Sequence, residues 1–127
     1  MMRPEPDTIL IVEDDVFISM DAADSVARAG ANVVTTETVR DALEYLDHGR
    51  ITAAILDFQV LDGFITPVVE RLRSAGIPYR VVSGTPAHEI EALGIPADRI
   101  VSKPADYFKI FVSLINDRPW ASLRATA

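Results

Sequence analysis

The chain has 127 residues, of which 49% are hydrophobic, and a formal net charge of −7. This length suits one domain, and the apolar fraction is sufficient for a core. The acidic balance argues against a nucleic-acid surface, because such binding depends on Lys and Arg that neutralise phosphates. No apolar run approaches the ~20 residues that span a bilayer, and the absence of cysteine excludes disulfides and thiolate metal sites. The first seven residues are polar and broken by proline, unlike a signal peptide, so we expect a cytoplasmic protein without membrane contact.

Five short runs rich in Val and Ile alternate with amphipathic stretches along the chain. The runs predict strands at 8–12, 32–35, 53–57, 79–82 and 99–101. The stretches predict helices at 16–29, 39–48, 67–75, 87–93 and 106–117. The strands show little polar alternation, as expected when helices cover both faces of a sheet. The order is (βα)5, and right-handed crossovers then give an α/β fold with a parallel sheet.

The helical periodicity also predicts which side chains face the core. In the first predicted helix these are Val16, Met20, Ala23 and Ala27. The short fourth helix has two large anchors, Ile90 and Leu93. The last helix carries a wide apolar stripe comprising Tyr107, Phe108, Phe111, Leu114 and Ile115.

Helix ends are predicted from glycine, threonine and proline. Four glycines follow predicted helices, where a left-handed residue caps the last turn. They are Gly30, Gly49, Gly76 and Gly94. Thr66 followed by Pro67 predicts an N-cap and a proline at the first helical position of the third helix.

Polar residues follow four of the five predicted strands. Function in such sheets gathers outside the carboxyl ends of the strands, so we expect these residues to lie close together. They are Glu13-Asp14-Asp15, Asp57, Ser83-Gly84-Thr85 and Ser102-Lys103-Pro104. Carboxylates placed together repel one another unless a cation joins them. The pattern therefore predicts a divalent metal and phosphoryl chemistry.

Taken in this order, the motifs resemble the receiver domain of bacterial two-component response regulators. The resemblance covers residues 8 to about 117, and its segments are 9–15, 55–57, 81–85 and 102–104. It implies the flavodoxin-like or CheY-like fold, a doubly wound five-stranded parallel sheet with strand order 2-1-3-4-5. The short form is similar to a branch of stand-alone receivers seen in alphaproteobacteria.

The resemblance implies a phosphoacceptor and a metal site. Asp57 matches the phosphoacceptor, and a carboxylate is a competent nucleophile that gives an acyl phosphate. Glu13 and Asp14 match the metal-binding acids, with Asp57 and the backbone carbonyl of Gln59 as further ligands. Mg²⁺ suits this set because it takes oxygen ligands in octahedral geometry and keeps several waters. The metal offsets repulsion between the nucleophile and the incoming phosphoryl oxygens.

The remaining site residues match groups that act on the phosphoryl oxygens. Ser83 matches the Thr or Ser whose hydroxyl bonds a phosphoryl oxygen after transfer. Lys103 matches the lysine that pairs first with the phosphoacceptor and then with the phosphoryl group. Pro104 matches a proline that follows this lysine through a cis peptide bond. Thr85 and Gln59 occupy positions that tune hydrolysis of the acyl phosphate.

The sequence departs from the family's pattern at the switch position and in one loop. Ile100 occupies the position of the aromatic switch residue, which puts the usual coupling of hydroxyl and aromatic side chains in doubt. Ala105 stands where Phe is common. Leu61 stands where the loop after the phosphoacceptor usually has proline, and Asp62-Gly63 arrives two residues early.

Each site residue taken alone has a simpler interpretation. Asp57 could be a helix N-cap, and the acidic pair at 13–14 could be a solvated helix start. Ser83 alone indicates a turn, and Lys103 alone indicates a solvated cation. Asp15 is expected to cap the first helix. The joint occurrence of these residues at successive strand ends is what favours a site.

Three other functions share parts of this pattern. A flavodoxin-like cofactor binder has the same fold, but the acids at 13–15 would repel its phosphate. A haloacid-dehalogenase-type phosphatase has a second Asp two places after its nucleophile, where this chain has Gln59. A pseudo-receiver, which binds proteins without phosphorylation, normally lacks an acid or the lysine, and this chain keeps them all. It remains the alternative.

The predicted function is a phosphoacceptor that assists its own phosphorylation and dephosphorylation and is not otherwise an enzyme. The donor would be a phosphohistidine on a sensor kinase or phosphotransfer protein, or a small donor such as acetyl phosphate. The readout would be contact with a downstream protein through the face formed by 87–93, 99–101 and 106–117. We expect a monomer or weak homodimer.

The expected domain organisation is simple. Residues 1–7 form a flexible start, 8–117 the receiver domain and 118–127 a short tail. Trp120 in that tail is expected to pack on the last helix or to contact a partner. With no output domain following, DNA binding or catalysis is expected to lie in a partner.

Overall fold

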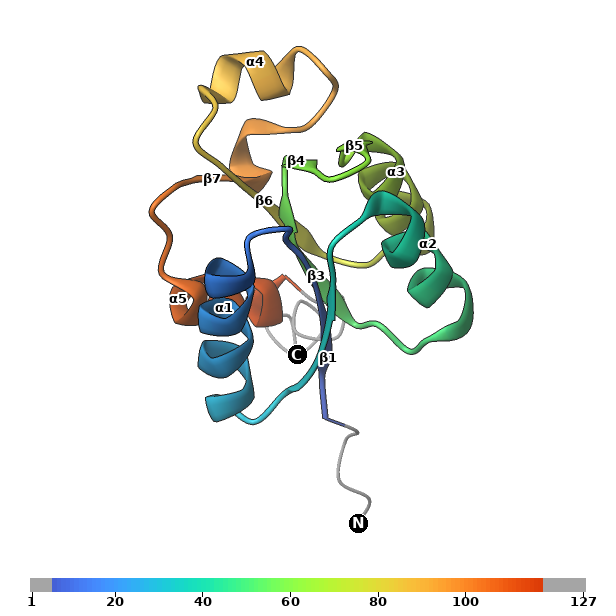
Figure 1. Ribbon diagram of the computed structural model, residues 1–127, viewed down its shortest axis with the longest axis vertical. Helices are drawn as coiled ribbons and strands as arrows, with labels where there is room; N and C mark the ends of the chain where they lie inside the picture. The colour runs from blue at the N-terminus through green and yellow to red at the C-terminus, as the bar shows by residue number, and fades with distance from the viewer. Residues whose placement is uncertain (1–5, 118–127) are drawn as a thin grey trace, which may run out of the picture.

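Five parallel strands form the centre of the molecule (Figure 1). The computed structural model describes residues 6–117. The strands of the sheet are β1 (Thr8–Val12), β2 (Asn32–Thr36), β3 (Ala53–Asp57), β6 (Tyr79–Ser83) and β7 (Ile100–Ser102). Their order is β2-β1-β3-β6-β7, which confirms the predicted α/β fold with order 2-1-3-4-5 when these five strands are counted along the chain. The prediction for Trp120 lies outside the described residues.

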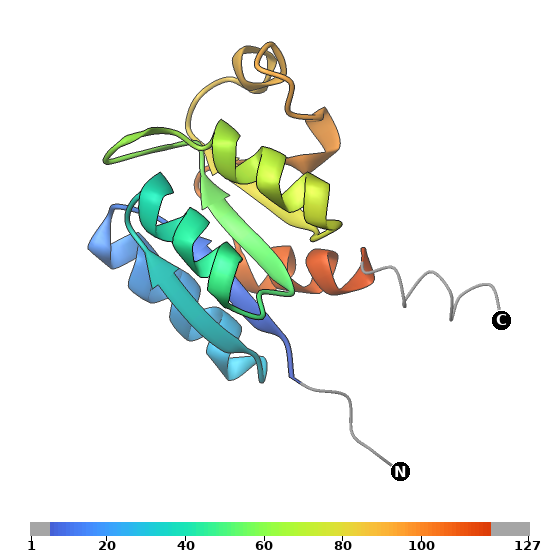
Figure 2. The ribbon, with the colours of Figure 1, turned by 90° about the vertical axis from the view of Figure 1, so that its right-hand side faces the viewer.

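Helices cover both faces of the sheet (Figure 2). They are α1 (Val16–Arg28), α2 (Val39–His48), α3 (Thr66–Ala75), α4 (Ala87–Glu91) and α5 (Tyr107–Asn116), with a 3-10 turn η1 (Ala97–Arg99). The helices α1 and α5 pack together on one face, and α2 and α3 pack together on the other. No helix among residues 6–117 is both long enough and apolar enough to cross a bilayer.

Successive strand residues point to opposite faces and so build two cores. In β1, Leu10 and Val12 pack in the core that includes side chains of α2, α3 and α4. Ile9 and Ile11 pack in the core that includes side chains of α1 and α5. All four are at most 2% exposed. Burial on both faces explains why this strand shows no polar alternation.

A two-stranded antiparallel hairpin, which the sequence analysis does not predict, follows β3. Its strands are β4 (Gln59–Val60) and β5 (Gly63–Phe64). The rings of Phe58 and Phe64 lie 5.1 Å apart, which ties the hairpin to the end of β3. Gly63 has a φ of 135°, a conformation that favours glycine. The unusual residues Leu61 and Asp62 thus make the turn of this hairpin, and Gly63 begins its second strand.

The predicted core face of α1 is wrong at Val16, Met20 and Ala27, which are exposed, whereas Ala23 is half-buried and packs against the core as predicted. Val16 and Met20 are 54% and 64% exposed, whereas Ala22 and Val26 are buried. The helix rests on the sheet beside α5 through these small or branched residues, and Ile18 packs beside them. The buried stripe of α1 is therefore centred on Ala22 and Val26, and the larger apolar side chains of Val16 and Met20 lie in solvent.

Two further core predictions, for Phe108 and Leu93, are wrong. Phe108 is 54% exposed because α5 buries Tyr107 and Phe111 on its sheet-facing side. Leu93 is 50% exposed because it follows the end of α4, whereas Ile90 is fully buried.

The predicted helix ends are partly confirmed. Gly30, Gly76 and Gly94 have positive φ as predicted. Gly49 does not, because its φ is −104° and the chain leaves α2 in an extended conformation. Glycine is needed there for space, since a Cβ would lie 2.8 Å from the Tyr45 carbonyl oxygen. Thr66 is not the N-cap of α3 because the helix begins at that residue, and Ile65 precedes it without a side-chain cap.

Candidate functional site

The acidic residues predicted for the site meet at the carboxyl edge of the sheet. Glu13 follows β1 directly and Asp57 ends β3, and the two strands pair in parallel with Val12 opposite Leu56. One carboxylate oxygen from each of Glu13, Asp14 and Asp57 lies within 4.8 Å of the other two. This separation allows one small cation to contact all three groups, and oxygen ligands are those that Mg²⁺ prefers. The residues present therefore fit the predicted metal.

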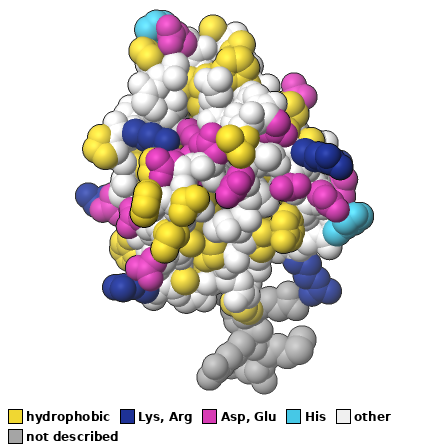
Figure 3. Space-filling view, viewed as in Figure 1, with side chains coloured by type: hydrophobic (Ala, Val, Ile, Leu, Met, Phe, Trp, Pro, Cys, Tyr) yellow, Lys and Arg dark blue, Asp and Glu magenta, His cyan; other side chains and the backbone are white. Residues whose placement is uncertain are grey.

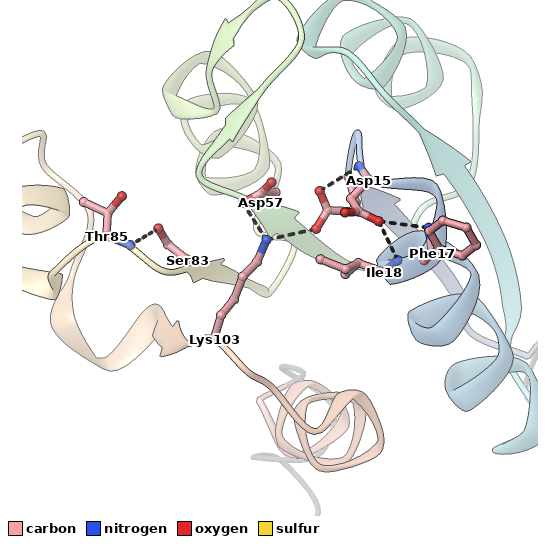
Figure 4. Close-up of polar contacts among 8 residues, drawn as sticks. Asp15, Phe17, Ile18, Asp57, Ser83, Thr85 and Lys103 are labelled. Carbon is pink, nitrogen blue, oxygen red and sulfur yellow. Dashed lines mark hydrogen bonds and ion pairs between the residues drawn. The ribbon is translucent and has the colours of Figure 1, made fainter.

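Lys103 reaches this cluster from the loop after β7 (Figure 4). Its Nζ donates a hydrogen bond of 3.1 Å to Glu13 Oε1 and lies 3.5 Å from Asp57 Oδ1. The backbone N–H of Lys103 also donates to the Ser83 carbonyl oxygen at 2.9 Å. The predicted pairing with Asp57 is thus present, but the closer partner is Glu13.

The pKa values reflect the crowding of charge. Burial and then the hydrogen bond shared with Asp57 raise the pKa of Glu13. Burial and then the neighbouring Glu13 raise the pKa of Asp14. For Lys103, burial acts to lower the pKa, but the hydrogen bond to Glu13 and the charge of Asp57 outweigh it and raise the pKa. Ionisation of all three carboxylates is therefore unfavourable in the absence of a metal ion, and a bound cation would stabilise their charged forms.

Ser83 and Thr85 lie on the neighbouring strand end. Ser83 ends β6 and is 4% exposed, and its neighbour Val82 is the register partner of Asp57. The Ser83 hydroxyl accepts a hydrogen bond of 2.9 Å from the Thr85 backbone N–H (Figure 4). This bond leaves the Ser83 hydroxyl proton available to donate a hydrogen bond of its own.

Asp15 is a helix cap, as predicted. Its carboxylate accepts hydrogen bonds from the backbone N–H groups of Phe17 and Ile18 at 2.9 and 3.1 Å. Its own N–H donates to Glu13 Oε2 at 3.2 Å. The start of α1 and the acidic cluster are therefore connected through one buried carboxylate, that of Glu13.

The other predicted site residues have different surroundings. Ile100 begins β7, pairs with Val81 and packs against the core on the side of α2 and α3. The Lys103–Pro104 peptide bond is cis, as the resemblance implies. Gln59 is exposed in β4, opposite Phe64 in the hairpin, and its role as a metal ligand stays a prediction.

Tyr107 was missed as a neighbour of the site. It is buried in the core, as its position in the apolar stripe predicts, but it also lines a small cavity with Glu13 and Asp57. Its pKa is raised by burial, an effect that the Lys103 charge opposes and the two carboxylates reinforce. The sequence gives one indication that Tyr107 lies near the site, because it stands four residues after Lys103, at the start of α5.

Asp62 is a second residue whose role was missed. Its two carboxylate oxygens accept hydrogen bonds from the N–H groups of Val39 and Arg40 at 2.7 and 3.1 Å. These bonds join the hairpin after β3 to the first turn of α2. Asp62, which arrives two residues early in this loop, thus has a structural role. It serves as a second N-cap of α2 beside Thr38.

The fold is that of response regulator receiver domains. A response regulator receiver protein from Sinorhizobium medicae has a TM-score of 0.80 at 22% identity, over 89% of this chain and 94% of that one. A CheY-like receiver domain from Methanospirillum hungatei has a TM-score of 0.80 at 18% identity, over 94% and 99%. The response regulator PhyR from Brucella abortus has a TM-score of 0.75 at 24% identity, over 98% of this chain and 52% of that one. No family model and no curated protein matches the sequence.

Proposed function

We propose that this chain is a response regulator receiver that accepts a phosphoryl group on Asp57 with the help of Mg²⁺. The observation that supports it most is the position of Lys103 between Glu13 and Asp57, at 3.1 and 3.5 Å, within a cluster of three carboxylates. One edge of the sheet thus carries a carboxylate that would serve as the nucleophile, a cation, and acids that could bind a metal ion. The receiver fold supports the same function.

The proposed transfer is an in-line displacement at phosphorus. A carboxylate oxygen of Asp57 attacks the phosphorus of a phosphohistidine, the P–N bond breaks, and the imidazole leaves with the bonding electron pair and takes up a proton. Lys103 lies close enough to turn from Glu13 to the new phosphoryl oxygens. The Ser83 hydroxyl donates to another phosphoryl oxygen. Mg²⁺ bound by Glu13, Asp14 and Asp57 would neutralise charge that builds up on these oxygens.

The same site would reset itself by hydrolysis. A water attacks the phosphorus opposite the Asp57 oxygen, the P–O bond to Asp57 breaks, and inorganic phosphate leaves. Gln59 and Thr85 occupy the positions that, in receiver domains, tune this hydrolysis by shaping access of the water to the phosphoryl group. We therefore propose that the chain assists both reactions of its own carboxylate and acts on no other substrate.

The proposed partners are a sensor kinase or phosphotransfer protein as donor and a downstream protein as target. Because phosphohistidine is made from ATP, we place the reaction in the cytoplasm. The readout would use the face formed by α4, β7 and α5. Ile100 packs on the core at the position of the aromatic switch, so transmission through that face would depend on shifts of α4 rather than on rotation of an aromatic ring.

Mass spectrometry of the intact protein tests this proposal. After incubation with acetyl phosphate or a phosphorylated phosphotransfer protein, we expect the wild type to gain one phosphoryl group only when Mg²⁺ is present. Asp57→Asn should gain none, and Asp14→Asn should gain far less. Asp21→Asn, the same change at an exposed position of α1, is the matched control and should behave as wild type.

The result that contradicts the proposal is clear. A folded wild-type protein that gains no phosphoryl group from either donor would instead support the pseudo-receiver. A gain that persists in Asp57→Asn would move the acceptor elsewhere.

A further inference from the structure

A pocket of about 380 Å³ lies at the opposite end of β6 from the site around Asp57. Tyr79 begins β6 and lines the pocket, whereas Ser83 ends the same strand beside the acidic site. Two arginines line the pocket as well, Arg73 in the last turn of α3 and Arg99 in η1. Its apolar walls are formed by Ile77, Pro78 and Pro96. The pocket shares no residue with the acidic cluster.

The charged groups of this pocket leave a positive excess. Arg73 Nη1 donates a hydrogen bond of 3.3 Å to a backbone carbonyl oxygen after α4, and the guanidinium forms an ion pair with no described carboxylate. Arg99 pairs with its neighbour Asp98, whose side chain is 73% exposed. Asp117 also lines the pocket, but the buried guanidinium of Arg80 pairs with it. One positive charge therefore has no counter-charge among the described residues, although the chain has a formal net charge of −7.

This charge distinguishes the pocket from other parts of the surface. Acidic side chains spread across the face between α1 and α2 (Figure 3). The walls of the pocket at the start of β6 carry two arginines and one acid, and that acid is already paired. The pocket is therefore suited to an anion, in a protein that is acidic as a whole.

Tyr79 supplies an unused hydrogen-bond donor. The residue is 4% exposed, and its hydroxyl makes no hydrogen bond with any described residue. In the described part of the chain, the Thr36 hydroxyl is the only buried side-chain polar atom that lacks both a partner and contact with solvent, so the Tyr79 hydroxyl still reaches solvent. It does so through the pocket that Tyr79 lines. A phenolic O–H in this position can donate to a ligand.

The two arginines lie near this hydroxyl. Burial raises the pKa of Tyr79, whereas the charges of Arg73 and then Arg99 act to lower it. The hydroxyl therefore keeps its proton at neutral pH, and it lies within the field of both guanidinium groups. Three donors from α3, β6 and η1 are thus gathered around one space.

We propose that this pocket binds a small organic carboxylate, with the carboxylate group held by Arg73, Arg99 and the Tyr79 hydroxyl. A guanidinium presents N–H donors in a planar fork that matches a carboxylate, and such charge-assisted bonds are stronger than neutral ones. The remaining walls are apolar, and the hydrocarbon part of the ligand packs against them. The volume lies in the range of small-molecule sites.

The charge balance favours a ligand with a single negative charge. A monoanion neutralises the excess charge of Arg73, whereas a phosphate dianion would add a negative charge close to Asp98 and Asp117. The inference goes beyond the proposed phosphorylation of Asp57 and does not depend on it, because it uses none of that site's side chains.

Titration followed by ¹H–¹⁵N NMR tests the proposal on the intact chain at constant ionic strength. The probe is cyclohexanecarboxylate, and cyclohexanecarboxamide is the neutral analogue of nearly the same shape. We expect the carboxylate to shift the amide resonances of residues 73–77 and 97–99, and the carboxamide to leave them unchanged. Inorganic phosphate, which has no apolar part, should bind more weakly than the carboxylate.

Variants connect binding to the named residues. Arg73→Gln changes an exposed side chain and should weaken binding of cyclohexanecarboxylate about fivefold. Tyr79→Phe removes only a hydroxyl and should weaken binding about threefold. It should keep the wild-type Tm, because that hydroxyl has no partner among the described residues. Arg71→Gln is the matched control, because it removes the same charge from α3 at a position that pairs with Asp47 and does not line the pocket.

Four results would overturn the proposal. They are a carboxylate that shifts no resonances, a carboxamide that shifts them equally, phosphate that binds as tightly as the carboxylate, and an Arg71→Gln variant that weakens binding as much as Arg73→Gln. Unchanged binding in a folded Tyr79→Phe variant would remove the hydroxyl from the site.

Discussion

The ammonium group of Lys103 lies closer to Glu13 than to Asp57, at 3.1 Å against 3.5 Å. The Glu13 side chain is 5% exposed, whereas that of Asp57 is 12% exposed. The more deeply buried carboxylate thus takes the shorter bond, as expected because it has less water to stabilise its charge. Lys103 therefore stabilises the cluster of carboxylates through both ion pairs.

Replacing Lys103 by Met should destabilise the protein in the absence of divalent metal. The change keeps the apolar stem but leaves the buried Glu13 without its charged donor, which costs about 2 kcal/mol. Urea unfolding at neutral pH measures the effect. Lys109→Met, at an exposed position of α5, is the matched control and should change the free energy of unfolding by less than about 0.5 kcal/mol. Equal stability of the two variants would contradict the role of Lys103.

Asp14→Asn should raise the Tm at pH 7.5 when no metal is present and should remove the gain in Tm from Mg²⁺. The folded-state pKa of Asp14 is raised above 3.8 by burial and by Glu13, so its ionisation costs folding stability at neutral pH. That cost disappears as the pH falls below the ordinary value. The advantage of Asp14→Asn over wild type should therefore shrink as the pH is lowered from 7.5 to 4.

Thermal unfolding at both pH values, with and without Mg²⁺, checks this prediction. A gain of about 1 kcal/mol corresponds to a rise in Tm of about 4 °C in a domain of this size. Asp21→Asn should keep the wild-type response to Mg²⁺. A Tm that rises equally with Mg²⁺ in wild type and Asp14→Asn would show that the ion binds elsewhere.

Asp62→Ala should destabilise the protein more at neutral pH than at low pH. The backbone N–H groups of Val39 and Arg40 donate hydrogen bonds that lower the pKa of the Asp62 carboxyl below 3.8. The bond from Val39 has the larger effect. A lowered pKa means that the stabilising effect is present above pH 4 and is lost as the pH falls through the folded-state value. Urea unfolding at pH 7 and pH 3 should show a larger difference from wild type at pH 7 than at pH 3.

The variant Asp62→Asn separates charge from hydrogen bonding, because an amide oxygen still accepts one of the two bonds. It should lie between Asp62→Ala and wild type in stability at pH 7. If Asp62→Ala is as stable as wild type at pH 7, the hairpin does not stabilise the start of α2.

Leu56→Ala should reduce the free energy of unfolding by about 3 kcal/mol, because it removes buried methyl groups from the centre of β3. Leu56 is fully buried in the core on the side of α2 and α3. Leu61 is 66% exposed at the hairpin, and Leu61→Ala should change the free energy by about 0.5 kcal/mol or less. Urea unfolding of the two variants compares the same chemical change in the two environments.

The sequence was a reliable guide to the sheet and to the residues at its edge. The runs ending at Val12 and Asp57 form strands that end where predicted, because continuous apolar runs bounded by acids and turns indicate buried strands locally. Given parallel strands, the convergence of Glu13, Asp57 and Lys103 then follows from topology. The core face of α1 was not predictable in the same way. The face that includes Val16 and the face that includes Ala22 are similarly apolar, so the helical periodicity does not choose between them.

The sequence by itself determined which segments form the five strands of the sheet, which acids stand at the ends of β1 and β3, and the cap at Asp15, since each depends on residues close together in the chain. Only the tertiary structure decided that Lys103 takes Glu13 as its nearer partner, across 90 residues, and that Asp62 caps α2 from 23 residues away. Local patterns fix which face or end a residue occupies. They do not fix distances of a few tenths of an ångström between side chains from different elements, because these depend on how the whole sheet and its helices pack.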